Sequence, residues 1–431
     1  MLRFKKISTF FLCLFLGLYL STNAHPMPNS MVLLKIHEKN ISGEIQLPLG
    51  ELQSAIGMGV DDHSERLLER LGDSLRIYLK QHIRPKSFED KLWTVELGAM
   101  KVVETKSKLT GDYKELVVAF TMTPPPNADL RNFNFDYDVI LHQVASHQIL
   151  INIKQDWQQG IMADDSTMQQ IGVIAIDIPT GKIPVFQVSL QQGSGWMGFK
   201  SMVSLGINHI KEGTDHLLFL LTLLLPATLL VENKRWARFA GVKTSLLKLL
   251  KIVTAFTIGH SLTLIIGSFQ LINFPSQPIE ILIAISIFIS AIHAYKPLFE
   301  GKEIFIAGGF GLIHGLAFAD KITHLELNFQ QKIISIFGFN VGIELMQLFV
   351  VLLTMPFLIL LSQTKSYSIF RKVGSILVAI SALAWMVERV SGDSNFITQL
   401  IEKTASKSLY LLLVLVVISL ISYVRERELE R

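Results

Sequence analysis

The pattern of hydrophobic and polar positions changes character near Trp196. Before that residue, apolar side chains alternate with polar ones over short stretches; after it, they crowd into long apolar blocks. Alternation with a period of two is typical of half-buried β-strands, whereas uninterrupted apolar stretches of about 20 residues are typical of membrane-spanning helices. The pattern therefore predicts a multi-pass α-helical membrane protein with an amino-terminal β-sandwich-like domain.

Short strands separated by turn residues dominate residues 25–195, which we expect to form this β-rich domain outside the membrane. Four strand pairs are predicted across turns: 31–36 with 41–47, 93–103 with 114–121, 133–141 with 147–153, and 173–178 with 183–188. Residues 64–79 have the spacing of an amphipathic helix. No motif in this region resembles a catalytic site, so any chemistry is expected elsewhere.

Seven apolar segments follow within residues 198–425, and each can reach the length that a helix needs to cross the hydrocarbon core. They lie at 203–230, 247–269, 279–296, 303–320, 332–361, 370–388 and 407–424. We therefore expect about seven transmembrane helices, followed by a short tail at residues 426–431.

The first 24 residues have the form of a secretory signal peptide. A basic start is followed by the apolar stretch 7–20, and the small residues Thr22 and Ala24 precede a cleavage point. Cleavage there makes His25 the new amino terminus, where an α-amine and an imidazole form a chelating pair for metal ions. The alternatives are an uncleaved anchor helix and a His25 without a special role.

Cysteine usage narrows the possible chemistry of the mature chain. Of 431 residues, 50% are hydrophobic, the mean hydropathy is +0.41 and the net charge is +4. The one cysteine, Cys13, lies inside the signal segment, so the processed chain is expected to have neither a disulfide nor a thiolate ligand. No basic cluster with interleaved aromatic residues indicates nucleic-acid binding. A metal site must therefore use histidine, carboxylate or amide groups.

Lysine and arginine are distributed unevenly between the two sets of loops. The loops after the first, third and fifth segments, together with the tail, carry most of these residues, for example Lys234, Arg235 and Arg238. Positive loops remain on the cytoplasmic side of the membrane. We therefore expect a bacterial inner-membrane protein with a periplasmic amino-terminal domain and a cytoplasmic carboxyl terminus.

Ionisable residues inside the apolar segments are the candidate functional residues, because such groups are costly in a bilayer. The first segment carries His209 and His216, seven positions apart and so expected on one helix face, with Asp215 beside them. The rise of a helix places His216 near the bilayer middle.

Three further segments carry polar groups near the same depth. They are His260 in the second, His314 in the fourth and Glu344 in the fifth. We expect these residues, with those of the first segment, to form a metal site. Imidazole and carboxylate ligands without a thiol suit nickel, zinc or cobalt. The alternative is that the histidines are hydrogen-bonded packing residues, which we favour for His293 and Glu280 near helix ends.

The spacing of His209, five residues, then Asp215 and His216 resembles the first signature of the HupE/UreJ family of membrane proteins. These proteins accompany hydrogenase and urease and are regarded as nickel permeases. Residues 313–317 resemble the family's second signature, although Ala319 and Lys321 depart from it. The resemblance covers about residues 200–390 and implies metal-handling roles for His209, Asp215, His216 and His314; His260 and Glu344 rest on the depth argument alone.

Three functions remain open from the sequence. The first is a transition-metal permease or metal-delivery protein, with a metal ion and the lipid bilayer as its partners and with passive or ion-coupled transport, since no ATP-binding motif is present. The second is an intramembrane metal-dependent hydrolase that uses Asp215 and Ser261 around a metal-bound water. The third is a non-catalytic scaffold whose exported domain binds a periplasmic protein.

Overall fold

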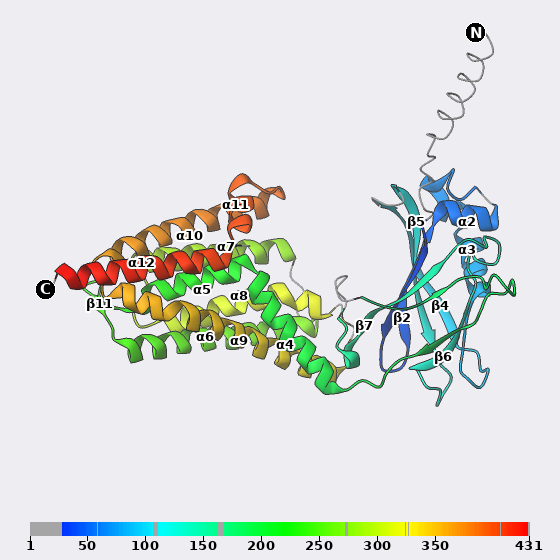
Figure 1. Ribbon diagram of the computed structural model, residues 1–431, viewed down its shortest axis with the longest axis horizontal. Helices are drawn as coiled ribbons and strands as arrows, with labels where there is room; N and C mark the ends of the chain where they lie inside the picture. The colour runs from blue at the N-terminus through cyan, green and yellow to red at the C-terminus, as the bar shows by residue number, and fades with distance from the viewer. Residues whose placement is uncertain are drawn as a thin grey trace, which may run out of the picture. The chain divides into compact units, whose positions relative to one another are not determined.

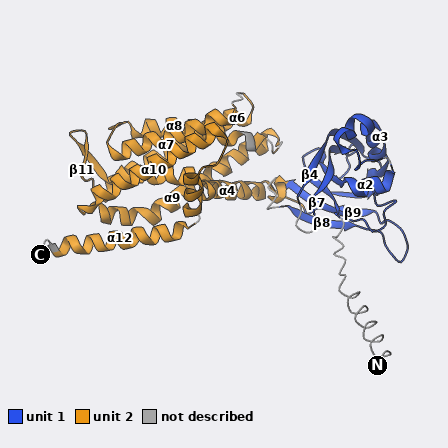
Figure 2. Cartoon of the chain, turned by 90° about the horizontal axis from the view of Figure 1, so that it is seen from above, with its two compact units in different colours: residues 1–155, 164–191 blue, residues 156–163, 192–431 orange. Residues whose placement is uncertain are grey.

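The computed structural model describes residues 28–429, apart from residues 58, 107–110, 163–167, 272–274, 324, 326 and 406. The expected signal peptide, Cys13 and His25 lie outside the described residues. The chain forms two compact units, residues 1–155 with 164–191, and residues 156–163 with 192–431 (Figure 2).

Two β-sheets build the first unit (Figure 1). The six-stranded sheet has the order β4 (Thr94–Thr105), β5 (Tyr113–Thr123), β2 (Ile41–Pro48), β1 (Ser30–Ile36), β7 (Ile149–Asp156), β8 (Gln169–Ile174). The three-stranded sheet has the order β3 (Ile83–Lys86), β6 (Asn132–Tyr137), β9 (Phe186–Ser189). Helices α2 (Leu49–Ile56) and α3 (Leu67–His82) join them, and the fold confirms a β-rich amino-terminal domain.

Alternation along β6 explains how this unit buries its core. Phe133, Phe135 and Tyr137 are almost completely buried, whereas the residues between them are only half-buried. Side chains on a strand alternate between its two faces, so these three aromatic residues cover the inner face of the smaller sheet. Gly172 of β8 makes room for the ring of Phe186 on β9, since a Cβ at Gly172 would lie 2.2 Å from that ring.

Two of the predicted strand pairs are confirmed. β1 pairs antiparallel with β2, with Met31 opposite Gln46, and β4 pairs antiparallel with β5. The predicted helix is also confirmed, as a short 3₁₀ turn (Ser64–Arg66) followed by α3. In each case the hydrophobic period is set by neighbouring residues, which is why local pattern suffices.

The other two predicted pairs do not form strand ladders, although an isolated antiparallel bridge joins Asp177 to Lys182 across one of the predicted turns. β6 pairs with β3 and β9, and β7 lies beside β1 in the other sheet; β8 pairs with β7 instead of with the strand at 186–189. The chain between β6 and β7 contains Ile140 in the left-handed region, with φ of 66°. This loop carries the chain from one sheet to the other and does not close a hairpin, so sequential strands need not pair.

Apolar helices build the second unit and confirm the class of multi-pass membrane protein. Within the described residues, five helices are long and apolar enough to cross a membrane: α6 (Val242–Ser268), α7 (Ser276–Tyr295), α9 (Phe329–Ser362), α10 (Ser366–Ser391) and α12 (Ser408–Leu429). Two shorter apolar helices are α5 (Thr214–Ala227) and the part of α8 (Glu303–Thr323) up to Ala319. The helices α4 (Gly195–Glu212) and α11 (Phe396–Ala405) complete the set.

The first predicted span, residues 203–230, is not one helix. It breaks at Gly213, whose backbone is extended with ψ of 91°, and so divides into α4 and α5. A Cβ at Gly213 would lie 2.6 Å from the carbonyl oxygen of His209, which only glycine avoids. At its other end the segment leaves the helix and enters the hairpin β10 (Leu229–Glu232) and β11 (Arg235–Phe239).

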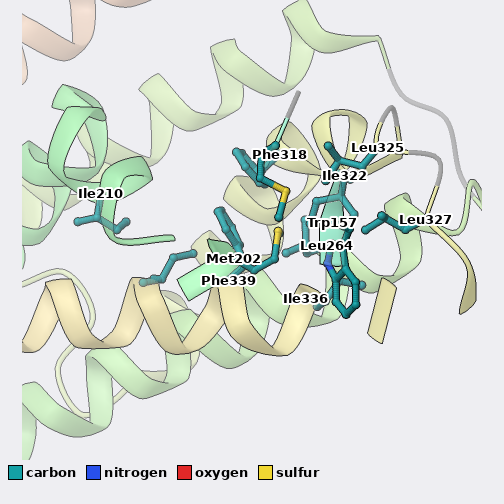
Figure 3. Close-up of a cluster of buried hydrophobic side chains, with 13 residues drawn as sticks. Trp157, Met202, Ile210, Leu264, Phe318, Ile322, Leu325, Leu327, Ile336 and Phe339 are labelled. Carbon is teal, nitrogen blue, oxygen red and sulfur yellow. The ribbon is translucent and has the colours of Figure 1, made fainter. Parts of the chain in front are cut away.

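Glycines allow two pairs of helices to approach closely. A Cβ at Gly311 or Gly315 of α8 would come within 2.2 Å of the backbone of α6, and a Cβ at Gly342 of α9 within 2.1 Å of Val203 on α4. Next to these contacts lies an apolar cluster in which Phe318 and Phe339 stack with ring centroids 4.1 Å apart (Figure 3). Small residues at the interface and aromatic packing beside it fix the positions of the polar groups on α4, α6 and α8.

Candidate metal centre

Four histidine rings from four helices gather inside the membrane unit. His209 lies in the last turn of α4, His216 in the first turn of α5, His260 on α6 and His314 on α8. The ring centroids are 4.5 Å apart for His209 and His216, 5.0 Å for His216 and His314, and 6.3 Å for His209 and His260. The break at Gly213 places two of these rings at adjoining helix ends.

The proton position on His216 follows from its partner. Nδ1 of His216 lies 2.9 Å from Oδ1 of Asp215. A carboxylate accepts hydrogen bonds and cannot donate one, so Nδ1 carries the hydrogen, and in the neutral ring Nε2 carries the lone pair. Asp215 therefore holds the ring of the residue next to it in the sequence.

The proton position on His314 follows in the same way. Its Nε2 lies 3.0 Å from Oγ of Ser286 on α7, and that hydroxyl donates its own hydrogen to the carbonyl oxygen of Ile283 at 2.7 Å. Oγ of Ser286 therefore accepts from Nε2–H of His314, and Nδ1 of His314 carries the lone pair. Sequence reasoning missed Ser286; its only signal is a hydroxyl in the middle of an apolar helix.

The two lone pairs face each other. Nε2 of His216 lies 3.4 Å from Nδ1 of His314, beyond the usual hydrogen-bond range of about 2.7–3.2 Å. Two nitrogens bound to one tetrahedral metal ion at about 2.1 Å lie about 3.4 Å apart. Both rings are almost completely buried, so water cannot easily relieve the repulsion between the lone pairs. This arrangement suits a cation between the two nitrogens.

The other two rings lie among aromatic side chains. His209 packs against Phe318 and Phe339, with centroids 4.7 and 5.3 Å away. His260 is fully buried, and among the described residues neither of its ring nitrogens has a hydrogen-bond partner, although Asn340 lies beside it. A buried imidazole without a partner costs stability unless something else binds it. His260 is thus a further donor available to a cation.

Glu344 does not join the four rings. Its Oε2 accepts a hydrogen bond from Thr257 at 2.6 Å, and its Oε1 accepts one from Thr254 at 3.0 Å. Both threonines precede His260 on α6, and Thr257 lies about one turn away from it. Glu344 lies about one helical turn from the level of His260 along the bundle. The direction of its side chain depends on which helix α9 packs against.

A cavity of about 220 Å³ lies beside the break between α4 and α5. Asp215 lines it, together with the carboxylates of Glu212, Glu280 and Glu402; Arg389 also lines it and forms an ion pair with Glu280 at 3.0 Å. Carboxylates gathered in a concave site attract cations. Asp215 thus borders the cavity on one side and holds His216 on the other.

Other polar candidates have packing roles. Nδ1 of His293 accepts hydrogen bonds from the backbone of Leu298 and Phe299, which fixes the chain after α7. The hydroxyl of Ser261 donates its hydrogen bond to the carbonyl oxygen of Thr257 instead of to a histidine ring. In the part of the chain that the structure describes, no three His, Cys, Asp or Glu side chains are yet arranged to hold one metal ion.

Comparison with protein families matches residues 186–389 to the family described as HupE / UreJ protein. Neither the curated proteins nor the solved structures gave a match. The matched region contains the helices α4 to α10 and all four histidines of the candidate centre. Over residues 186–389, a multi-pass membrane segment that follows a separate β-rich domain, this chain is similar to proteins of the HupE/UreJ family.

Proposed function

We propose that the membrane unit binds a divalent transition-metal ion between His216 and His314 and passes it across the membrane or delivers it to another protein. The observation that carries the proposal is the pair of unprotonated nitrogens, Nε2 of His216 and Nδ1 of His314, 3.4 Å apart in a buried site. The HupE/UreJ family is linked to nickel and cobalt handling, which agrees with imidazole ligands. Nickel or a similar cation, such as cobalt or zinc, is the cargo.

Two further imidazoles can complete the coordination. His209 lies beside His216, with ring centroids 4.5 Å apart, and His260 lies beside His209, with centroids 6.3 Å apart; rotation of these side chains toward the pair would bring a third nitrogen to the ion. Asp215 keeps His216 in the tautomer that binds the ion and supplies negative charge close to it. The site therefore forms fully when the ion enters, which suits transient binding during transport.

A path for the ion can be followed through the same residues. The carboxylate-lined cavity beside Gly213 offers an entrance, and Asp215 connects it to the histidine pair. The next oxygen ligands are offered by Thr257 on α6, about one turn from His260, and by Glu344 on α9, which accepts a hydrogen bond from Thr257. In this proposal the protein lies in a bacterial inner membrane, and the ion enters from the periplasmic side.

The test is the amount of Ni²⁺ bound per chain by the purified full-length protein in detergent, after equilibrium dialysis. The change His216→Asn preserves an N–H donor to Asp215 but removes the Nε2 ligand. The change His314→Gln preserves a donor to Ser286 but removes the Nδ1 ligand. Each variant is expected to lose one bound ion per chain, because loss of a direct ligand costs more than the roughly 10–100-fold cost of losing a group that only orients a ligand.

The matched control is His293→Asn. His293 is a buried histidine of the same helical unit, and the asparagine Oδ1 can accept the two backbone hydrogen bonds that Nδ1 accepts. This variant is expected to bind Ni²⁺ like the unaltered protein. Full Ni²⁺ binding by both His216→Asn and His314→Gln, or equal loss in His293→Asn, would overturn the proposed centre.

A further inference from the structure

A second pair of histidines lies in the β-rich unit, far from the membrane centre in sequence. His82 is the last residue of α3, and His142 lies in the loop between β6 and β7. Their rings stack with centroids 4.1 Å apart and an interplanar angle of 23°. Both side chains are partly exposed, so an ion in solution can reach them.

One residue fixes the tautomer of both rings. Nδ1 of His82 lies 2.8 Å from Oδ1 of Asp138, and Nδ1 of His142 lies 3.1 Å from the main-chain oxygen of Asp138. A carboxylate and a carbonyl are acceptors only, so both Nδ1 atoms carry hydrogen, and in the neutral rings both Nε2 atoms carry lone pairs. The two Nε2 atoms lie on the sides of the rings away from Asp138, and no described residue makes a hydrogen bond to either.

The loop that presents His142 is held in an uncommon conformation. Ile140 has φ of 66°, a region that β-branched residues rarely occupy. Oη of Tyr78 accepts the backbone N–H of Ile140 at 2.9 Å, and the Tyr78 ring packs against both histidines. Strained backbone that is held by several contacts is concentrated at functional sites.

Hydrogen bonds and an ion pair hold the carboxylate of Asp138 in place. Arg84 approaches Oδ1 of Asp138 at 3.3 Å and also forms a bidentate pair with Asp136 on β6. The backbone N–H of Asp138 donates to the carbonyl oxygen of His82. Asp138 is thus hydrogen-bonded to His82 both through its backbone N–H and through its side chain.

We propose that Nε2 of His82 and Nε2 of His142 bind a divalent transition-metal ion in the β-rich unit, with water completing the coordination. The rings are 4.1 Å apart and only 23° from parallel, so they must turn toward each other at their Nε2 edges to share one ion; two imidazoles on one ion at a right angle have centroids about 4.5 Å apart. Neutral imidazoles favour nickel, copper or zinc over magnesium or calcium. The site stands on its own residues and does not depend on the membrane centre.

The test labels the imidazoles of the full-length protein in detergent with diethyl pyrocarbonate and reads each histidine by peptide mass spectrometry. Without metal, His82 and His142 are expected to react. Added Ni²⁺ or Zn²⁺ is expected to protect both with a single midpoint concentration, because they share one ion. His63, an exposed histidine of the same unit, serves as the control and is expected to react equally with and without metal.

Two variants separate shared binding from independent effects. His82→Asn preserves an N–H donor to Asp138 but removes the Nε2 ligand, so the midpoint for protection of His142 is expected to rise at least about tenfold. Asp138→Asn keeps the main-chain acceptor and removes the charge, and is expected to raise the midpoint about 10–100-fold.

Absence of labelling without metal, absence of protection by either ion, or protection of His142 that is unchanged in His82→Asn would each overturn the site. Because the readout is specific for each residue, failure here leaves the Ni²⁺ stoichiometry of the membrane centre unaffected. The converse also holds, so the two sites fail separately.

Discussion

His216 and His314 face each other through two nitrogens that both lack hydrogen, 3.4 Å apart. Each ring directs its N–H outward, His216 to Asp215 and His314 to Ser286, whose hydroxyl hydrogen is used by Ile283. Because both N–H groups point outward, the two inner nitrogens, Nε2 of His216 and Nδ1 of His314, are left as acceptors. A positive ion between them replaces the repulsion of two lone pairs by two attractive contacts.

Altering the outer ends of this chain should weaken metal binding without removing a ligand. Asp215→Asn is expected to raise the dissociation constant for Ni²⁺ about 10–100-fold, because the remaining amide no longer fixes the tautomer of His216. Ser286→Ala is expected to act in the same direction, since Nε2–H of His314 then lacks an acceptor and the hydrogen can move to Nδ1. Isothermal titration of the full-length protein measures both; unchanged binding in Ser286→Ala would contradict the assigned tautomer.

Removing both central ligands should be no worse than removing one. His216→Ala and His314→Ala are each expected to abolish uptake of metal by cells while expression and membrane insertion remain. The double variant is expected to match either single variant, because residues that act as one unit are non-additive. Cellular nickel content, with membrane abundance measured in parallel, tests this. Independent, additive losses would indicate two separate packing residues.

The stability of the β-rich unit should depend on pH through His147. This side chain is 3% exposed and lies between Oγ of Ser30 at 2.7 Å and Oε2 of Glu51 at 3.2 Å. Burial lowers the pKa of His147 from 6.5 to about 4. The unfolded chain therefore protonates this histidine near pH 6.5, whereas the folded chain protonates it only near pH 4. About 3 kcal/mol of folding stability, fully present above pH 6.5, is lost as the pH falls between these two values.

Thermal melting followed by circular dichroism in the strand region measures this dependence. Burial also raises the pKa of Glu51, which acts in the opposite sense near its own pKa and offsets part of the loss. His147→Gln, which cannot titrate, is expected to melt at temperatures that vary much less between pH 4 and pH 6.5. An equal slope in the variant and the unaltered protein would assign the dependence to other groups.

Loop charges make a testable statement about orientation. Reporter fusions near Arg238, in the hairpin after α5, and near Tyr367, at the start of α10, are expected on the cytoplasmic side. Fusions at Asn395, after α10, are expected outside. A periplasmic signal at Arg238 would reverse the topology and with it the direction of metal entry.

Processing of the amino terminus follows from the small residues Thr22 and Ala24. Amino-terminal sequencing of the protein purified from membranes is expected to begin at His25. That end would carry an α-amine and an imidazole as a second chelating group. A protein that begins at Met1 or at an internal residue would remove the terminal chelator and leave the two histidine sites as they are.

The class of the fold was determined by the sequence alone because it depends on local periods. Apolar stretches of membrane length and period-two stretches before Trp196 distinguish the two regions without any knowledge of contacts. The residues of the first signature, His209, Asp215 and His216, were also singled out from the sequence. The shared helix face expected for the two histidines was wrong, because the helix breaks at Gly213 and the two residues lie on α4 and α5.

Tertiary structure decided what those residues do together. The glycine break at Gly213, the hydroxyl of Ser286 on another helix and the turn of Glu344 toward α6 depend on packing between segments distant in sequence. The same is true of β6, which buries its aromatic face in the second sheet because the left-handed Ile140 leads the chain away from a hairpin. The sequence pattern shows which side of a helix or strand is apolar. It does not show which neighbour that side contacts, because the neighbour is set only when the helices and sheets pack. The neighbour in turn decides which ring nitrogen keeps its lone pair.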